Sequence, residues 1–315
     1  GADHYDAATG IYFDPGDAQF PEVKACPSLD DARISLGLLE DAICTFPFVD
    51  ATDRAVAISA IVTACTRPTL RTAPMHGFTA PVAGSGKSTL VDIASIIATG
   101  REAAVIAEGK NEEETEKRLG ALLLEGAGAL SLDNCDKPVG GQLLCQVVTQ
   151  ATVRVRRLGK SEAPNLPTTA LVTATGNNLR FEGDMVRRAL ICRLDPGVER
   201  PETQQFAFDP LQKVQLLRPK LVVAALTIMR AYACAGFPNG TPPLGSFRDW
   251  SQRVRDALIW AGCVDPVASM EHVRAQDPVL ENIGTAFAQI NEHVGGRDFT
   301  VPELIKLATE YDSLL

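Results

Sequence analysis

The sequence predicts an α/β fold in which a three-layer core stands between a helical unit and a C-terminal helical region. Three observations indicate this. From about residue 75 to residue 194, short apolar strands alternate with amphipathic helices, a pattern typical of layered α/β domains. A glycine-rich loop stands between the first strand and the first helix of that stretch. Residues 29–66, and the chain beyond Pro196, repeat their apolar positions with the period of a helix.

The composition is that of an ordinary globular protein. Of 315 residues, 45% are hydrophobic and 22% are charged, with a mean hydropathy of +0.03, which excludes a disordered chain and a collagen-like fibre. The longest strongly apolar stretch, Leu221–Met229, is far shorter than the roughly 20 residues of a membrane-spanning helix, so we expect no membrane association. Gly1–His4 shows no signal peptide and the eight cysteines form no C-x-x-C pair, so we expect a cytoplasmic protein with free thiols.

Four regions follow one another along the chain. Residues 1–28 are acidic and rich in Asp, Gly and Pro, which is typical of a tail or linker. Residues 29–70 form the helical unit, in which Pro47 separates two helices. Residues 71–200 form the core, and residues 201–315 form a C-terminal helical lid region. We expect strands at 76–80, 103–106, 127–132, 152–158, 169–175 and 189–194, and helices at 88–98, 112–124, 142–150, 219–234, 246–261 and 279–293.

The strongest chemical signal is a glycine-rich loop that follows a strand and opens a helix. Its glycines let backbone N–H groups wrap phosphate oxygens, with the positive end of the helix dipole behind them. Lys87 would reach the β- and γ-phosphates of ATP, and the Ser88 hydroxyl would bind Mg²⁺. The pattern G-x-x-x-x-G-K-[ST] begins with glycine where this chain has Pro81, but the phosphate-wrapping amides lie nearer Lys87. The predicted ATP-binding residues of this P-loop are Gly84, Ser85, Gly86, Lys87, Ser88 and Thr89.

A second signal is an acidic residue at the end of the apolar strand Ala129–Leu132. Asp133 would lie beside the P-loop, where it could hold the Mg²⁺ shell. Many ATPases follow this acid with a Glu that activates water, but here the next residue is Asn134, which cannot accept a proton. The general base is therefore unassigned, with Asp136 and Glu108 as candidates.

A third signal is the strand that ends in Gly176-Asn177-Asn178. An asparagine beside the γ-phosphate could orient the attacking water, so Asn177 and Asn178 are candidate catalytic residues. The same tripeptide is also typical of a plain turn that closes a strand. Both interpretations stay open at this point.

Basic residues concentrate in one part of an acidic chain. The net charge of −9 argues against a protein that coats nucleic acid. Residues 151–193 nevertheless contain eight basic and three acidic residues, a local charge of +5, which indicates a local anionic partner. Alternation over 152–158 places Arg154 and Arg156 on one face, with Lys160 at the turn that follows. The alternative is a solvated basic hairpin on the outer surface.

Together these motifs resemble the ATPase domain of phage and mobile-element primase-helicases, which is related to superfamily 3 and MCM-like AAA+ motors. The resemblance covers roughly residues 70–270 and implies an AAA+-like P-loop fold. It also implies a ring-forming ATP hydrolase, expected to be a hexamer, that acts as a DNA helicase or translocase on DNA in a central pore. The motifs that carry it are Gly84–Ser88, Leu132–Asn134, Val153–Ser161, Thr175–Asn178, Gly183–Arg188 and Trp250–Arg255 followed by Asp265-Pro266.

The resemblance assigns roles to further residues. Asn134, beside Asp133, is kept among the candidate catalytic residues although it departs from the generic AAA+ pattern. Arg188, or in second place Arg187, would reach the γ-phosphate held by a neighbouring subunit. Arg255, or in second place Arg253, would contact the nucleotide from a lid helix. The residues expected to grip DNA in the pore are Arg154, Arg156, Arg157 and Lys160.

Two other functions stay open. One is a P-loop ATPase that remodels protein partners without DNA, although such a protein has no need of the basic hairpin. The other is a small-molecule phosphotransferase, although paired arginines before a core strand suit a subunit interface better than a substrate lid.

Overall fold

A parallel sheet of five strands forms the centre of the molecule, with the order β4-β5-β8-β3-β9. β3 therefore has a strand on each side, and β8 separates it from β5. The predicted α/β class is confirmed. The strands are β3 (Met75–Ala80), β4 (Ala104–Ala107), β5 (Ala129–Asp133), β8 (Leu171–Asn177) and β9 (Ala189–Arg193). The structure, a computed structural model, describes residues 4–6, 11–13, 18–107, 109, 111–156, 162–198, 201, 208–275, 278–295 and 300–310.

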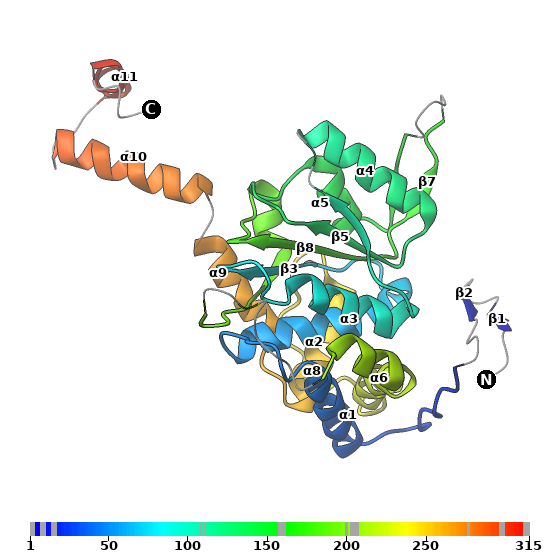
Figure 1. The fold of residues 1–315 in the computed structure, drawn as a ribbon. Helices are drawn as coiled ribbons and strands as arrows, with labels where there is room; N and C mark the ends of the chain where they lie inside the picture. Colours follow the sequence, from blue (N-terminus) through cyan, green and yellow to red (C-terminus); the bar gives the residue numbers. More distant parts are fainter. Residues whose placement is uncertain are drawn as a thin grey trace.

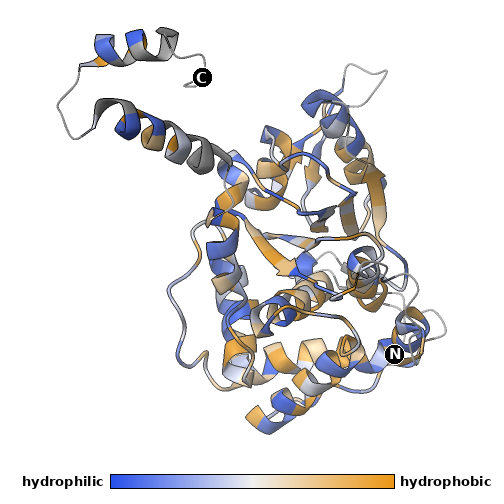
Figure 2. Ribbon diagram, turned by 60° about the vertical axis from the view of Figure 1, so that its left-hand side comes forward, coloured by the Kyte–Doolittle hydropathy of each residue, from blue (hydrophilic) through white to orange (hydrophobic). Residues whose placement is uncertain are grey.

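Helices cover both faces of this sheet (Figure 1). α4 (Glu112–Glu125) and α5 (Gln142–Thr149) lie on one face, and α3 (Lys87–Thr99) and α2 (Ala51–Thr66) lie on the other. A parallel strand that is covered on both sides is apolar throughout, and all six residues of β3 are buried. Figure 2 shows hydrophobic residues gathered in the sheet and in the helices packed on it, with hydrophilic residues on the outward sides.

An ion pair joins the N-terminal helical unit to the sheet. α1 (Leu29–Ala42) and α2 both begin at capping boxes, made by Ser28 with Asp31 and by Asp50 with Asp53. The buried carboxylate of Asp53 also binds Arg193 at the end of β9, with 2.9 Å between Oδ2 and Nη2. The same Nη2 lies 2.7 Å from Asp50 Oδ2. Since a buried charge needs a partner, this pair fixes the start of α2 against the end of β9.

Helix α6 (Pro210–Cys234) is longer than the sequence predicts. The sequence predicts a helix over 219–234, but the helix begins at Pro210, a residue type typical of a first turn, is capped by Asp209, and contains Pro219 inside it. Packing explains the difference. Nε of Arg218 donates to the carbonyl of Ile96, 3.0 Å away, at the end of α3. Nε also lies 3.2 Å from the carbonyl of Ile97, one of the last carbonyls of α3, which lack partners within their own helix. These contacts stabilise the packing of α6 against the end of α3.

The predicted helix 246–261 is interrupted by a π-helical turn at Ser251–Arg255, between α7 (Arg248–Trp250) and α8 (Asp256–Ala261). Trp250 is fully buried beside this turn and donates from Nε1 to Thr63 Oγ1 of α2 over 2.8 Å. Among the described helices, none is both long and apolar enough to cross a membrane. The remaining helices are α9 (Met270–Ala275), α10 (Pro278–Val294) and α11 (Val301–Glu310).

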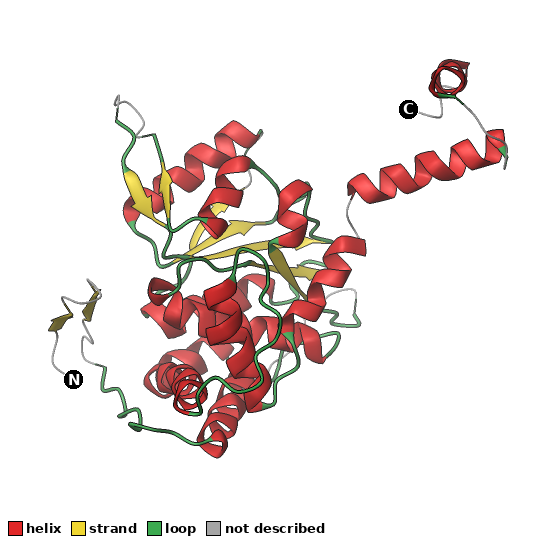
Figure 3. Ribbon diagram, turned by 180° about the vertical axis from the view of Figure 1, so that it is seen from behind, coloured by secondary structure: helices red, strands yellow, loops and turns green. Residues whose placement is uncertain are grey.

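Two short antiparallel hairpins lie outside the main sheet (Figure 3). β1 (His4–Asp6) pairs with β2 (Ile11–Phe13) in the region predicted to be a tail or linker. β6 (Thr152–Arg154) pairs with β7 (Asn165–Pro167), so the predicted hairpin is present. Its first strand is shorter than the predicted 152–158, and residues 157–161 lie outside the described part of the chain.

Candidate active site

The loop after β3 has the backbone that a phosphate-binding loop needs. Gly84 and Gly86 have positive φ values of 74° and 87°, a conformation that favours glycine. A Cβ on Gly86 would also lie 2.8 Å from the ring of Phe46, so a larger residue would clash there. Ser85 donates from Oγ to the carbonyl of Val82 over 2.7 Å, which stabilises the turn. α3 then begins at Lys87, so the loop delivers its backbone to a helix N-terminus.

Lys87 contacts the end of β8. Its Nζ lies 2.9 Å from Oδ1 of Asn177 and 3.1 Å from the carbonyl of Val82. Burial lowers the pKa of Lys87, and the nearby Asp133 carboxylate opposes that shift. Because an ammonium can only donate, the oxygen of the Asn177 amide faces Lys87 and the NH₂ group remains a donor for a ligand.

One carboxylate oxygen of Asp133 accepts hydrogen bonds from two hydroxyl groups. Ser88 Oγ donates to Oδ1 over 3.1 Å, and Thr175 Oγ1 donates to the same atom over 2.5 Å. Three neighbouring elements supply these residues: Ser88 is in α3, Asp133 ends β5, and Thr175 is in β8. A hydroxyl beside a carboxylate is a set of hard oxygen donors, which suits Mg²⁺.

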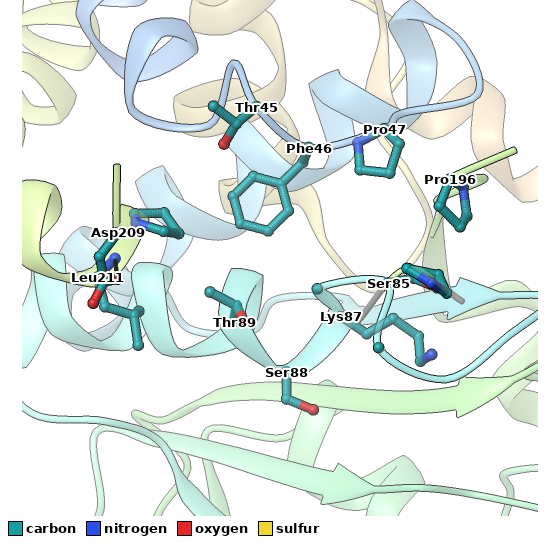
Figure 4. A pocket seen from close by; sticks show the side chains of 14 residues that line it. Thr45, Phe46, Pro47, Ser85, Lys87, Ser88, Thr89, Pro196, Asp209 and Leu211 are labelled. Carbon is teal, nitrogen blue, oxygen red and sulfur yellow. Dashed lines mark hydrogen bonds between the residues drawn. The ribbon is translucent and has the colours of Figure 1, made fainter. Parts of the chain in front are cut away.

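A cavity of about 450 Å³ opens beside the loop (Figure 4). Its floor is the loop and the start of α3, with Lys87, Ser88 and Thr89 exposed to it. Its walls are residues 45–47, Pro196 and the start of α6, and no motif in the sequence predicts these as part of the site. Backbone bonds hold the first wall in place, since Asp195 N donates to the carbonyl of Pro47 over 2.9 Å. The volume lies within the range of small-molecule sites.

The two asparagines that end β8 behave differently. Asn177 reaches Lys87, whereas Asn178 has a positive φ of 51° and donates its backbone N–H to the carbonyl of Ala80 over 3.1 Å. Asn178 is thus the turn residue, and Asn177 is the residue brought to the P-loop. Asn134 also has a positive φ, of 53°, and its N–H donates to Thr175 Oγ1 over 3.2 Å.

The structure does not identify a general base. Asp136 is exposed in the loop after β5 and, like Asp133 and Asn177, it is not among the residues that line the cavity, so the lining does not single it out. Glu108 lies outside the described residues. Asn134 is exposed, and an amide at this position can orient a water molecule without deprotonating it.

Arg187 and Arg188 lie at the opposite edge of the sheet from the P-loop. Arg188 directly precedes β9, whose first residue pairs with Met75 at the start of β3, whereas the P-loop follows the end of β3. At about 3.3 Å per residue, the length of β3 separates them by roughly 17 Å. Both arginines pair with Asp184, but Arg187 is 64% exposed and Arg188 only 16%. Their hydrogen bonds and charge, Arg187 first, lower the pKa of Asp184.

Arg255 is not brought to the cavity. Its guanidinium is buried and binds Asp265 through two hydrogen bonds, of 2.8 Å from Nε and 2.6 Å from Nη2. A third bond, from Nη1 to the carbonyl of Pro242, measures 2.9 Å. With its donors used in this way, Arg255 stabilises the packing of the C-terminal helices. Arg253 lies beside η1 (Arg67–Thr69) and also does not line the cavity.

The basic hairpin alternates as the sequence predicts. Val153 and Val155 are buried, while Arg154 and Arg156 are exposed on the other face. Nε of Arg154 donates to the carbonyl of Ala163 across the hairpin over 3.3 Å. The other two residues predicted to grip DNA, Arg157 and Lys160, lie outside the described residues.

No family model matches the sequence, and no curated protein matches it. Among solved structures, the chain is similar to the A form of the apo NrS-1 C-terminal region, at 15% identity and a TM-score of 0.49, over 90% of this chain and 60% of that chain. Another apo structure of that region has 15% identity and a TM-score of 0.44 over 85% and 57%. JCV helicase with a bound acetamide compound has 12% identity and a TM-score of 0.30 over 84% and 72%. The chain spans about three fifths of the length of the NrS-1 chain.

Proposed function

We propose that this chain is an ATP-driven motor of the helicase type, which hydrolyses ATP and translocates on DNA. One observation carries the proposal. The P-loop lysine, a hydroxyl, a strand-end carboxylate and a strand-end amide meet at the carboxyl edge of a parallel sheet, where ligands bind in open α/β folds. The four residues are Lys87, Ser88, Asp133 and Asn177.

The chemistry that these residues support is phosphoryl transfer from ATP to water. Backbone amides of the loop would cradle the phosphates, and Lys87 would neutralise charge on the β- and γ-phosphates. Asn177 would donate its NH₂ group to the γ-phosphate or to the attacking water. Its bond to Lys87 supports this role, because it fixes the direction of the amide.

Magnesium fits this site by its donor chemistry. Ser88 Oγ and the Asp133 carboxylate would hold the ion directly or through water. Among the described residues no cluster of three His, Cys, Asp or Glu side chains is present, so the nucleotide phosphates would complete the ligand set. When bound, Mg²⁺ would neutralise the charge that develops on the β- and γ-phosphate oxygens.

The rest of the cavity suits the base and sugar of a nucleotide. Phe46, Pro47 and Pro196 offer apolar surface on one side, and Leu211 at the start of α6 offers it on the other. Aromatic and apolar side chains commonly line such sites, with a few polar groups to orient the ligand.

A ring assembly is supported by the position of the paired arginines. They lie too far from the P-loop of their own chain to touch its nucleotide, yet Arg187 is exposed. We propose that Arg187 acts at the site of a neighbouring subunit, in a head-to-tail homo-oligomer such as a hexamer. Arg188, which is mostly covered and paired with Asp184, is the second candidate for this role.

DNA as the partner is supported by the basic hairpin. Arg154 and Arg156 are exposed side by side on one face of a hairpin outside the sheet. Such cations bind phosphates without reading bases, which suits a motor that moves along any sequence.

The decisive experiment measures ATP hydrolysis with and without single-stranded DNA. We expect the parent protein to hydrolyse ATP faster when DNA is added. Lys87→Ala should abolish hydrolysis, because the lysine neutralises the phosphates, and should leave the fold intact. An unchanged rate in Lys87→Ala would contradict the P-loop assignment. ATP hydrolysis without any response to DNA would contradict the DNA motor and favour a protein remodeller.

A further inference from the structure

Thr175 lies at the metal side of the candidate site without belonging to the P-loop or to the acidic strand end. It is in β8, 2% exposed, one residue beyond the pair that Ala174 forms with Leu132 of β5. Thr175 therefore stands opposite Asp133 on the neighbouring strand. Side chains at such positions point to the same face of the sheet and are close enough to interact.

The hydrogen bonds around Thr175 determine the direction of its hydroxyl. The backbone N–H of Asn134 donates to Oγ1 over 3.2 Å, so this oxygen is an acceptor there. Its single proton is then left for Oδ1 of Asp133, at 2.5 Å, because a carboxylate only accepts. The carbonyl of Thr175 accepts from Cys135 N over 2.8 Å. The turn after Asp133 is thus bound to Thr175 at two points.

These bonds leave Asp133 one orientation. Oδ1 accepts from Thr175 and from Ser88, so the carboxylate is held against the helix that carries the proposed magnesium ligand. Among the described residues, no hydrogen bond to Oδ2 accompanies these two. A threonine in a strand is stiff at χ1, which makes it a better support for a carboxylate than a flexible side chain would be.

We infer that Thr175 is a positioning residue for magnesium, which holds the Asp133 carboxylate in the orientation that the metal–nucleotide complex requires. The inference rests on the proposed function, because it concerns the same site. Partners behind a metal ligand typically change metal affinity by about 10-fold to 100-fold when they are removed. The backbone amides and Lys87, by contrast, bind the nucleotide without using Thr175.

The test measures equilibrium binding of a fluorescent ADP analogue, first with a metal chelator and then over a range of Mg²⁺ concentrations. Thr175→Val removes the hydroxyl at nearly constant volume, and Thr175→Ala removes it without crowding the strand. Thr175→Ser keeps the hydroxyl. Thr173→Val is the matched control, since Thr173 is buried two residues earlier in β8 and donates to the carbonyl of Leu130, 3.0 Å away.

We expect all variants to bind the analogue without Mg²⁺ within about twofold of the parent protein, because Lys87 and the loop amides are unchanged. Mg²⁺ should increase the affinity for the ADP analogue. In Thr175→Val and Thr175→Ala, the Mg²⁺ concentration that gives half of this increase should rise by about tenfold or more. Thr175→Ser and Thr173→Val should resemble the parent protein.

Two results would overturn the inference alone: an unchanged Mg²⁺ requirement in both hydroxyl-free variants, or an equal shift in Thr173→Val. A parent protein that binds no nucleotide, or binds it without any effect of Mg²⁺, would instead overturn the proposed function and this inference with it.

Discussion

At the scale of single residues, two consecutive asparagines at the end of β8 have different surroundings. In the tripeptide Gly176-Asn177-Asn178, the Asn177 amide contacts Lys87 and Asn178 is the turn residue, so a catalytic role stays a prediction for Asn177. The difference follows from the register of β8 against β3. Asn177 is the last paired residue and lies opposite Ala80, just before the P-loop, whereas Asn178 follows the strand and has a positive φ. The sequence does not predict this register, because the register is determined by the packing of β8 against β3, a strand about 95 residues earlier in the chain.

His76 in β3 is a second residue whose state follows from its surroundings. Nε2 of His76 lies 3.0 Å from Ser59 Oγ, and this hydroxyl also lies 2.8 Å from the carbonyl of Val56. Burial lowers the pKa of His76 to about 3. The imidazole is therefore neutral in the folded protein.

This predicts that acid destabilises the fold through His76. Below the ordinary pKa of 6.5, the unfolded chain binds a proton that the folded chain does not bind until about pH 3. The free energy of unfolding should therefore fall as pH drops through that window, by up to about 1.4 kcal/mol per pH unit. Urea unfolding at about pH 7 and about pH 5 measures it, with an expected loss of about 2 kcal/mol from this residue.

His76→Gln is the comparison for that measurement. Its amide can donate to Ser59 or accept from it but does not titrate, so the variant should lose less stability than the parent protein between the two pH values. An equal loss in both proteins would contradict the assignment of the acid effect to His76.

At the scale of elements, prediction succeeded where local pattern determines structure. The glycine-rich loop, the buried strands and the amphipathic helices of the core lie close to where the sequence predicts them. Prediction failed where contacts between residues far apart in the sequence determine the structure. Pro219 lies inside α6, next to Arg218, which contacts the end of α3. The walls of the cavity come from segments about 40 and 110 residues away from the P-loop in sequence.

The basic hairpin yields the prediction that belongs to this scale. Arg154→Ala combined with Arg156→Ala should weaken binding of single-stranded DNA by about tenfold or more at low salt, equally for different sequences. The slope of log affinity against log salt should become shallower by about one to two, since two phosphate contacts are lost. Fluorescence anisotropy over a series of salt concentrations measures both.

The matched control is Arg33→Ala, an exposed arginine in α1 that should leave DNA binding unchanged. If the double variant binds DNA with the affinity and salt dependence of the parent protein, the hairpin is not the DNA contact. A change of the same size in Arg33→Ala would indicate an effect of net charge instead.

At the scale of the whole molecule, the separation between Arg187 and the P-loop predicts complementation between defective subunits. Lys87→Ala lacks the P-loop cation, and Arg187→Ala lacks the arginine for the neighbouring site, so each alone should hydrolyse little ATP. In an equal mixture about a quarter of the interfaces combine an intact lysine with an intact arginine. The rate of ATP hydrolysis in the mixture should therefore recover to about a quarter of the parent rate. The rate should also rise more than linearly with protein concentration.

Arg188→Ala serves as the second arm of the mixing experiment, because Arg188 is the alternative arginine. Recovery with Arg188→Ala and not with Arg187→Ala would reassign the role. Full hydrolysis by a demonstrated monomer, or no recovery with either arginine variant, would contradict a shared site.

The connection between the hairpin and β8 has a mechanical consequence. Only residues 168–170 separate β7 from β8, and Thr168 anchors the foot of the hairpin by donating to the carbonyls of Ala151 and Gln150. A load applied to the hairpin would therefore pass partly into β8, the strand that contains Thr175 and Asn177. If DNA pulls on the hairpin, the force would reach the phosphate site through the short extended segment between β7 and β8. The stiffness of this segment would determine how far the site moves for a given movement of the hairpin.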